Sequence, residues 1–237
     1  MQFSADDWTA IFLTIRIAGT AIVLGMPFAI AMALLLARKD FYGKIVLDGL
    51  VHLPLVLPPV VTGYFLLIGF GNHGIFGRAL AQCCSITLAF RWTGAALAAA
   101  IMAFPLMVRA IRLSFEAVDP LYASAARTLG ARPWQVFLHV TLPLSMPGIL
   151  AGAILGFAKA LGEFGATITF VSNIPGQTQT IATRIYSDLQ TPSGDAGVLR
   201  LTIISVLIAF SAMLASQIFA SRMKTKKTLA LSANKGQ

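Results

Sequence analysis

The sequence predicts an all-α integral membrane protein with about five transmembrane helices, from its composition, its long apolar runs and the placement of its charges. The chain has 237 residues, of which 57% are hydrophobic and 11% charged, and its mean hydropathy is +0.79. A soluble domain carries about 25% charged residues. Because this chain has less than half of that, it lacks the polar surface needed to cover a water-soluble globule.

Five apolar runs are long enough to cross a bilayer, which takes about 20 residues of helix. They cover approximately residues 10–37, 50–70, 88–113, 147–171 and 199–221. A bilayer offers no water to backbone groups, so long apolar runs are expected to be helical. The first run is too long for a signal peptide and follows the acidic Asp6 and Asp7, so we expect it to be retained. We expect one transmembrane domain, 1–221, and a basic tail, 222–237.

The basic residues predict the orientation of the chain. Twelve Lys and Arg residues fall in the segments on one side of the expected spans and four on the other. The side richer in Lys and Arg is cytoplasmic, so we expect a periplasmic N-terminus and a cytoplasmic C-terminus. The net charge of +9 is distributed between spans and in the tail, which indicates membrane topology and not a nucleic-acid surface.

The second run begins with three prolines, Pro54, Pro58 and Pro59. Each removes a backbone donor and obstructs a regular helix. One interpretation is a bent helix beside a transport pathway, because broken helices at membrane depth need protein or water beside them. The other is a slow start to a helix at the membrane interface.

The fourth run carries glycines at every fourth position, Gly148, Gly152 and Gly156. Small residues at this spacing form a flat strip on which two helices approach closely. The strip fits packing within one chain or, alternatively, a seam between two chains.

The segment between the third and fourth runs, residues 119–143, predicts two short helices. Asp119 is a suitable N-cap, and the proline that follows it suits the first helical position. Gly130 suits the residue just after a helix. Pro133 can start a second helix, which Leu142-Pro143 is expected to end. Two helices joined at a glycine would form a compact lug on the cytoplasmic surface.

This segment resembles the cytoplasmic loop of ABC-importer permeases, which has the pattern Glu-Ala-Ala, three residues, Gly, nine residues, Ile, any residue, Leu-Pro. In the family this loop is the coupling helix that docks into the ATPase subunit. Ser124 stands at the Glu position, which puts in doubt any polar contact of that Glu but not the helix–Gly–helix geometry. The matching residues are Ala125, Ala126, Gly130, Val140 in the Ile position, Leu142 and Pro143.

The similarity to molybdate permeases of this kind extends over nearly the whole chain, from about residue 8 to 220. It is carried by the segments 52–61, 104–112, 125–130 and 161–176. The resemblance implies the type I ABC importer permease fold and a homodimer in the bacterial inner membrane. It also implies two copies of an ATP-binding subunit and a periplasmic oxyanion-binding protein that delivers molybdate or tungstate. Transport would then proceed by alternating access.

Lys159 and Glu163 are two ionisable residues expected in the middle of the fourth run, on one helix face. Charges at this depth usually face a bundle interior or a cavity. They could line the translocation path, with Lys159 attracting an oxyanion, or form a structural pair. Hydroxyls and amides further along offer donors to an oxyanion, or could simply form a loop: Thr167, Thr169, Ser172, Asn173, Gln177 and Thr178.

The sequence contains no P-loop motif and no recognisable catalytic motif, and its histidines and cysteines show no metal-ligand spacing. We therefore expect a transport subunit that uses no cofactor or metal and does not hydrolyse ATP itself. The alternatives are a sulfate or thiosulfate ABC permease, a secondary transporter or channel, and an assembly scaffold. A secondary transporter would not need the lug, and five spans without a repeat fit it poorly.

Overall fold

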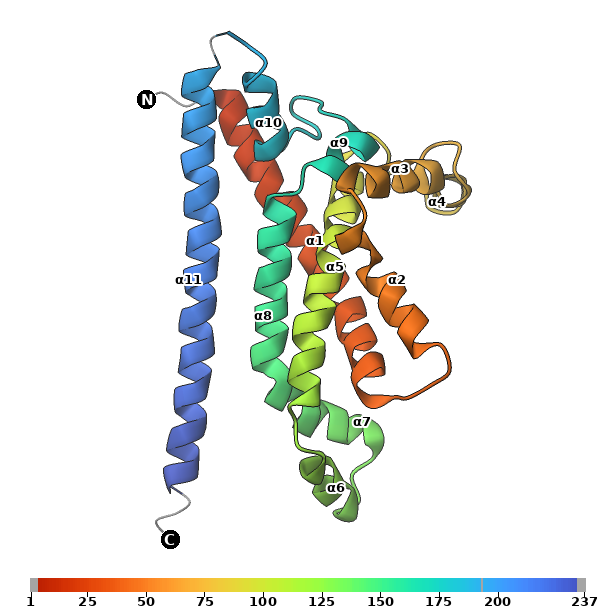
Figure 1. Ribbon diagram of the computed structural model, residues 1–237, viewed down its shortest axis with the longest axis vertical. Helices are drawn as coiled ribbons and strands as arrows, with labels where there is room; N and C mark the ends of the chain where they lie inside the picture. Colours follow the sequence, from red (N-terminus) through yellow and green to blue (C-terminus); the bar gives the residue numbers. More distant parts are fainter. Residues whose placement is uncertain (1–3, 193, 234–237) are drawn as a thin grey trace.

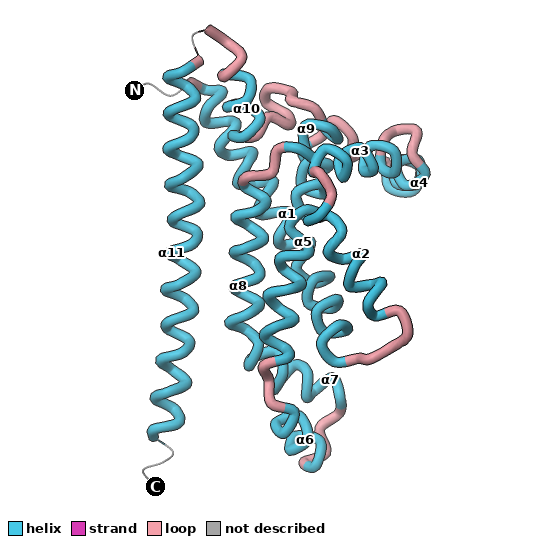
Figure 2. Tube along the Cα trace, in the orientation of Figure 1, coloured by secondary structure: helices cyan, strands magenta, loops and turns pink. Residues whose placement is uncertain are grey.

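The computed structural model describes residues 4–192 and 194–233, with only the backbone course of Cys84 and of residues 215–233. The described residues are helical or in loops, with no strand (Figures 1 and 2). The helices are α1 (Ala5–Arg38), α2 (Lys44–Val56), α3 (Pro59–Phe70), α4 (Ile75–Cys84), α5 (Trp92–Glu116), α6 (Pro120–Thr128), α7 (Pro133–Val136), a π-helix (Phe137–Thr141), α8 (Leu142–Leu161), α9 (Gly165–Val171), α10 (Ile181–Asp188) and α11 (Asp195–Ala233).

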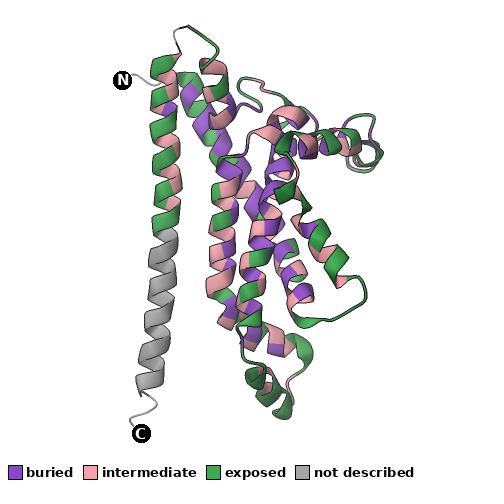
Figure 3. Cartoon of the chain, in the orientation of Figure 1, coloured by how far each residue is buried: buried purple, intermediate pink, exposed green. Residues whose placement is uncertain are grey.

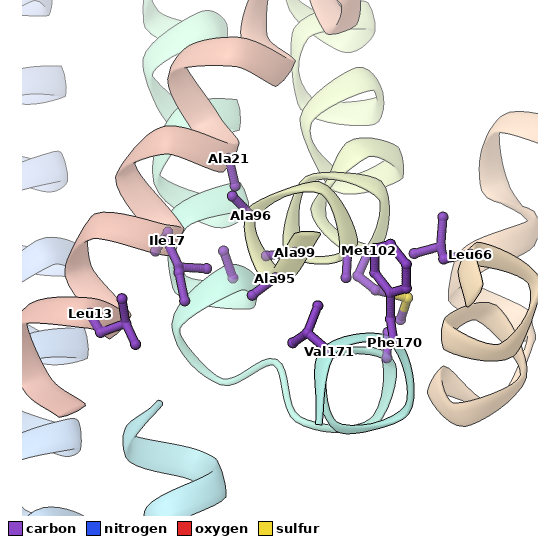
Figure 4. Close-up of a cluster of buried hydrophobic side chains, with 14 of the residues drawn as sticks. Leu13, Ile17, Ala21, Leu66, Ala95, Ala96, Ala99, Met102, Phe170 and Val171 are labelled. Atoms are coloured by element: carbon purple, nitrogen blue, oxygen red, sulfur yellow. The ribbon is translucent and has the colours of Figure 1, made fainter. Parts of the chain in front are cut away.

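Three long helices, α1, α5 and α8, form the centre of the molecule. The buried face of α5 is made largely of alanines, and these let α1 approach closely (Figure 4). Larger side chains, among them Met107, Ile111 and Phe115, form a second buried cluster in the C-terminal half of α5. Burial follows this arrangement, since the purple residues of Figure 3 concentrate where the three helices meet.

The glycine strip of α8 faces α5 and α1 of the same chain. A Cβ at Gly148 would lie 2.1 Å from Ser114 Cβ, and one at Gly152 would lie 3.0 Å from Ile111 Cγ1. A Cβ at Gly156 would lie 2.7 Å from Met107 Cγ. The strip therefore serves packing within one chain, the first of the two interpretations, and is not free to form a seam with another chain.

The second predicted span, 50–70, is not one straight helix. Helix α2 ends at Val56, α3 begins at Pro59, and the two helices are bent by 112°. Pro54 lies inside α2, so the break falls at Leu57-Pro58, where consecutive prolines remove two neighbouring backbone donors. The predicted bend in this segment is therefore confirmed, and its place beside a transport pathway stays a prediction.

The fourth span was predicted over residues 147–171, but the long helix in this region begins earlier and ends earlier. Helix α8 begins earlier, at Leu142, and ends at Leu161. The residues after the break form the separate short helix α9. A Cβ at Gly165 would lie 2.7 Å from Pro59 Cβ, and one at Gly63 2.9 Å from the Ala166 Cα. The start of α9 therefore packs directly on the start of α3, and the two helix breaks meet.

Leu142-Pro143 does not end the second helix of the lug, contrary to the sequence prediction. The chain runs from α7 through the π-helix into α8, and the stretch Pro133–Leu161 is one continuous apolar helix. Leu142 donates its N–H to the Phe137 carbonyl, five residues back. This wider turn lets the helix pass a proline, since the ordinary helical bonding pattern is already interrupted there.

Helix α11 runs along the outside of the bundle, and its first residues lie beside the start of α1 (Figure 1). Arg200 forms an ion pair with the buried carboxylate of Asp7, and Leu201 is buried against Ile11 and Ile181. The helix continues to Ala233, past residue 221 where we expect the basic tail to begin. Residues 234–237 of that tail lie outside the described part of the chain.

Candidate functional site

The lug consists of α6 and α7, joined by Gly130. Asp119 caps α6, because its Oδ1 accepts a hydrogen bond from the Leu121 N–H at 2.9 Å. Gly130 has φ of +86°, in the left-handed region that favours glycine. Gln135 Oε1 accepts the Arg132 N–H at 2.8 Å and fixes the start of α7. The three local signals expected from the sequence, the cap, the glycine turn and the second helix start, are confirmed.

The lug projects beyond the bundle (Figure 1), and most of its residues are exposed (Figure 3). None of the nine residues of α6 is buried. Leu129 is 89% exposed, Leu121 72% and Trp134 56%. Large apolar side chains gathered on one projecting element mark a surface for contact with another protein or with the membrane.

The residues at the motif positions differ in their exposure. Ser124, Ala125 and Gly130 are exposed, whereas Ala126 is half-buried. The Ser124 hydroxyl donates to the Pro120 carbonyl at 3.1 Å, so it is engaged within its own helix. Leu142 and Pro143 lie at the start of α8 and not on the projecting tip.

Lys159 and Glu163 form an ion pair at the end of α8, not in the middle of a span. Lys159 Nζ lies 2.9 Å from Glu163 Oε2. The Glu163 side chain is 2% exposed and the Lys159 side chain 29%. Glu163 Oε1 also accepts the Ala166 N–H at 3.0 Å, so the same carboxylate holds the first turn of α9. The pair thus lies at the break between the two helices, with the lysine on the more open side.

The hydroxyls and amides beyond this pair are mostly engaged in local structure. Thr169 donates to the Gly165 carbonyl at 2.9 Å, and Thr167 is buried. Asn173 donates to Ser187 Oγ at 2.6 Å, and Thr178 Oγ1 accepts the Ile174 N–H at 2.9 Å. Asn173 and Thr178 therefore fold the loop before α10, the second interpretation of these residues.

The structure also reveals polar contacts that the sequence did not predict. Arg112 in α5 pairs with Asp48 in α2, and Arg200 in α11 with Asp7 in α1. Arg112 and Asp48 are 64 residues apart in the sequence, and Arg200 and Asp7 are 193 residues apart. Arg112 also pairs with Glu116, and that contact has the i,i+4 spacing that a sequence can show. Contacts between distant helices leave no such signal.

Several helices of this chain are long and apolar enough to cross a membrane, which defines a multi-pass membrane protein. Residues 25–225 match the family described as "Binding-protein-dependent transport system inner membrane component". The chain belongs to this family. It is therefore a multi-pass inner-membrane transport subunit and not an enzyme, and ATP hydrolysis belongs to a separate subunit.

The chain is similar over most of its length to permeases of molybdenum transport systems. It is 53% identical over 217 residues to the "Molybdenum transport system permease protein ModB" of Escherichia coli (strain K12), covering 92% of this chain and 95% of that protein. It is 50% identical over 218 residues to the protein of the same name from Haemophilus influenzae, with the same coverage of both chains.

The fold is that of a solved bacterial ABC transporter that imports the acidic polysaccharide alginate. The TM-score is 0.73 at 18% sequence identity, covering 93% of this chain and 80% of that one. The predicted fold class, an importer permease built of helices, is confirmed.

Proposed function

We propose that two copies of this chain form the pathway through which molybdate crosses the inner membrane by alternating access, with tungstate as a second cargo. Two copies of a separate ATPase would drive the cycle, and a periplasmic oxyanion-binding protein would deliver the anion. The observation that carries the cargo assignment is the 50–53% identity to molybdenum transport permeases over more than nine-tenths of both chains.

The lug is the proposed docking element for the ATPase. Its motif positions, from Ser124 to Gly130, lie on or beside an exposed apolar surface that a partner would bury. Leu142 and Pro143 would act differently, because they lie where the lug continues into α8 without a break. A displacement of the docked lug would therefore pass directly into a membrane span.

The proposed orientation places the lug in the cytoplasm. The start of α1 and the lug lie at opposite ends of the molecule, while the far end of α11 lies at the same end as the lug (Figure 1). A cytoplasmic lug thus requires a periplasmic N-terminus and a cytoplasmic C-terminus, in agreement with the distribution of Lys and Arg. The binding protein would dock on the opposite end, at residues 71–90 and 172–198.

The broken helix α2–α3 supports a homodimer. Backbone that departs from helical geometry at membrane depth is tolerated only beside protein or water. The bend at Pro58 is flanked by exposed apolar side chains, including Val56, Val60 and Tyr64. A second copy of the chain, with a water-filled path between the two, would cover this surface.

The proposed path runs beside the Lys159–Glu163 pair and the first turns of α9, where Thr169 is partly exposed and Thr167 is buried behind it. Lys159 is partly exposed although Glu163 is not, so its ammonium group can attract an oxyanion while the carboxylate limits how tightly the anion is held. A transporter gains from such balance, because a ligand drives a conformational change only through its different affinity for the two states.

Reconstitution tests this function. This chain, its cognate ATPase and the binding protein, together in proteoliposomes, are expected to take up radiolabelled molybdate only with ATP, while the chain alone hydrolyses none. Unlabelled tungstate should compete and sulfate should not. Stronger competition by sulfate than by tungstate would instead favour a sulfate or thiosulfate permease.

A further inference from the structure

A cluster of charged side chains joins the lower part of α5 to the broken helix. Arg112 Nη1 lies 3.0 Å from Asp48 Oδ2 in α2. The Nε of the same guanidinium lies 2.8 Å from Glu116 Oε1, one turn further along α5. Arg112 is thus held on its own helix by Glu116 and reaches across to α2 with its remaining donors.

Helix α2 has little else that attaches it to the bundle. All thirteen of its residues are described, and Val51 is the only one that is buried. Its principal neighbour is α5, while Ile45, Val46 and Leu50 are exposed. The Asp48–Arg112 contact therefore contributes a larger share of the attachment of α2 than an ion pair contributes to a well-buried helix.

The two ends of α2 lead to different functional elements. Near its first turns, Asp48 contacts α5, which ends at Glu116, only four residues before the lug begins at Pro120. At its other end α2 reaches the bend at Pro58 and continues as α3. Helix α3 packs on α9 through Gly63, next to the Lys159–Glu163 break.

We propose that the Asp48–Arg112 ion pair is the link through which displacement of the lug moves the broken helix α2–α3. This inference rests on the proposed coupling function of the lug. Asp48 and Arg112 are positioning residues: they touch neither cargo nor ATP, and they make α2 follow α5. Arg112 is 26% exposed and Asp48 36%, and both line a cavity of about 340 Å³ between the helices.

The first test measures coupling in the complete transporter, as molybdate taken up per ATP hydrolysed. Asp48→Asn and Arg112→Gln, which keep size and remove charge, should each lower this ratio by about fivefold or more, the usual scale of coupling between sites. Basal ATPase activity should stay near that of the unaltered complex. The double variant should lose no more than either single one, because both remove the same contact.

Asp40→Asn is the matched control. Asp40 Oδ1 lies 2.8 Å from Lys44 Nζ. This ion pair joins two residues at the start of α2 and does not reach α5. The hydrogen bond and charge of Lys44 hold the pKa of Asp40 below its usual range. Loss of this ion pair should leave the ratio unchanged. Unchanged ratios in Asp48→Asn and Arg112→Gln, or losses that multiply in the double variant, would overturn the proposal.

A second readout needs no cargo. Spin labels at the exposed positions of Val46→Cys and Leu113→Cys, with Cys83 and Cys84 replaced by serine, report the distance between α2 and α5 in the complex with the ATPase. With Arg112 present this distance should stay constant between nucleotide-free and ATP-bound states. With Arg112→Gln it should change between them, and a distance that stays constant there contradicts the link. Failure of molybdate uptake by the unaltered complex would instead refute the proposed cargo alone.

Discussion

At the scale of single residues, the buried carboxylate of Glu163 depends on its two partners. Glu163 is buried with only 2% of its side chain exposed, yet it accepts a backbone N–H from Ala166 and pairs with Lys159. Removing one partner of such a buried pair costs about 3–5 kcal/mol, because an uncompensated charge remains. A single substitution at Lys159 therefore tests stability and transport together.

We expect Lys159→Met to lower molybdate uptake strongly. The informative companion is Lys159→Met with Glu163→Gln, which removes both charges and leaves no unpaired carboxylate. If Lys159 attracts the anion, the double variant also fails to transport, although its assembly with the ATPase, measured by co-purification, recovers. Restored uptake in the double variant would show that the pair is only structural.

At this scale the sequence located the charged pair but not its surroundings. The four-residue spacing of Lys159 and Glu163 was sufficient to predict a contact, and the contact is present. Their position at a helix break was not predicted, because the apolar run resumes after Glu163 and continues to Val171, and hydropathy averaged over a whole span does not register a short break. The Asp48–Arg112 and Asp7–Arg200 pairs arise from tertiary packing alone, for which a single sequence carries no local signal.

At the scale of elements, close packing of α8 on α5 depends on glycine. Gly156→Val would place side-chain atoms where Met107 and Ile22 now lie. Overpacking of this kind costs about 1–3 kcal/mol, so we expect a lower melting temperature of the detergent-solubilised protein. Gly162→Ala is the control, since a Cβ there meets nothing closer than 3.9 Å. Equal melting temperatures for the two variants would contradict this account of the strip.

The turn between α6 and α7 gives a second prediction at this scale. Gly130 has φ of +86° and open space around it, so a substitution acts through the backbone alone. Gly130→Val should cost about 1–3 kcal/mol of local strain and reduce co-purification of the ATPase. Gly130→Asn, which tolerates the left-handed region, should retain most of it. Equal binding by both variants would show that the turn does not position the lug.

Elements were predicted well where one local rule applied and poorly where two competed. The spans followed from hydropathy, and the lug from a cap, a glycine and a proline. The break in the second span was placed only within a group of three prolines, because Pro54 is accommodated inside α2. The continuity through Pro143 was missed because a proline was taken to end a helix, whereas a π-helical turn carries the chain past it.

For the whole molecule, the energy source lies outside this chain. No P-loop occurs in the sequence, and the lug projects from the bundle with large exposed apolar side chains that a partner subunit could cover. Deleting the partner ATPase is therefore expected to abolish molybdate uptake in cells, and dissipating the proton gradient while ATP is maintained should leave it intact. Uptake that follows the proton gradient would favour a secondary transporter.

The unbroken helix from Pro133 to Leu161 also fixes the relative rotation of its two ends. Its 29 residues span about 43 Å at 1.5 Å per residue. One residue inserted within α8, between the lug and Lys159, would turn the lysine by about 100° relative to Trp134, whereas seven inserted residues would nearly restore the original angle. The helical repeat thus fixes the angle between the lug and the charged pair about the helix axis. We expect an insertion of seven residues in α8 to retain more molybdate uptake than an insertion of one.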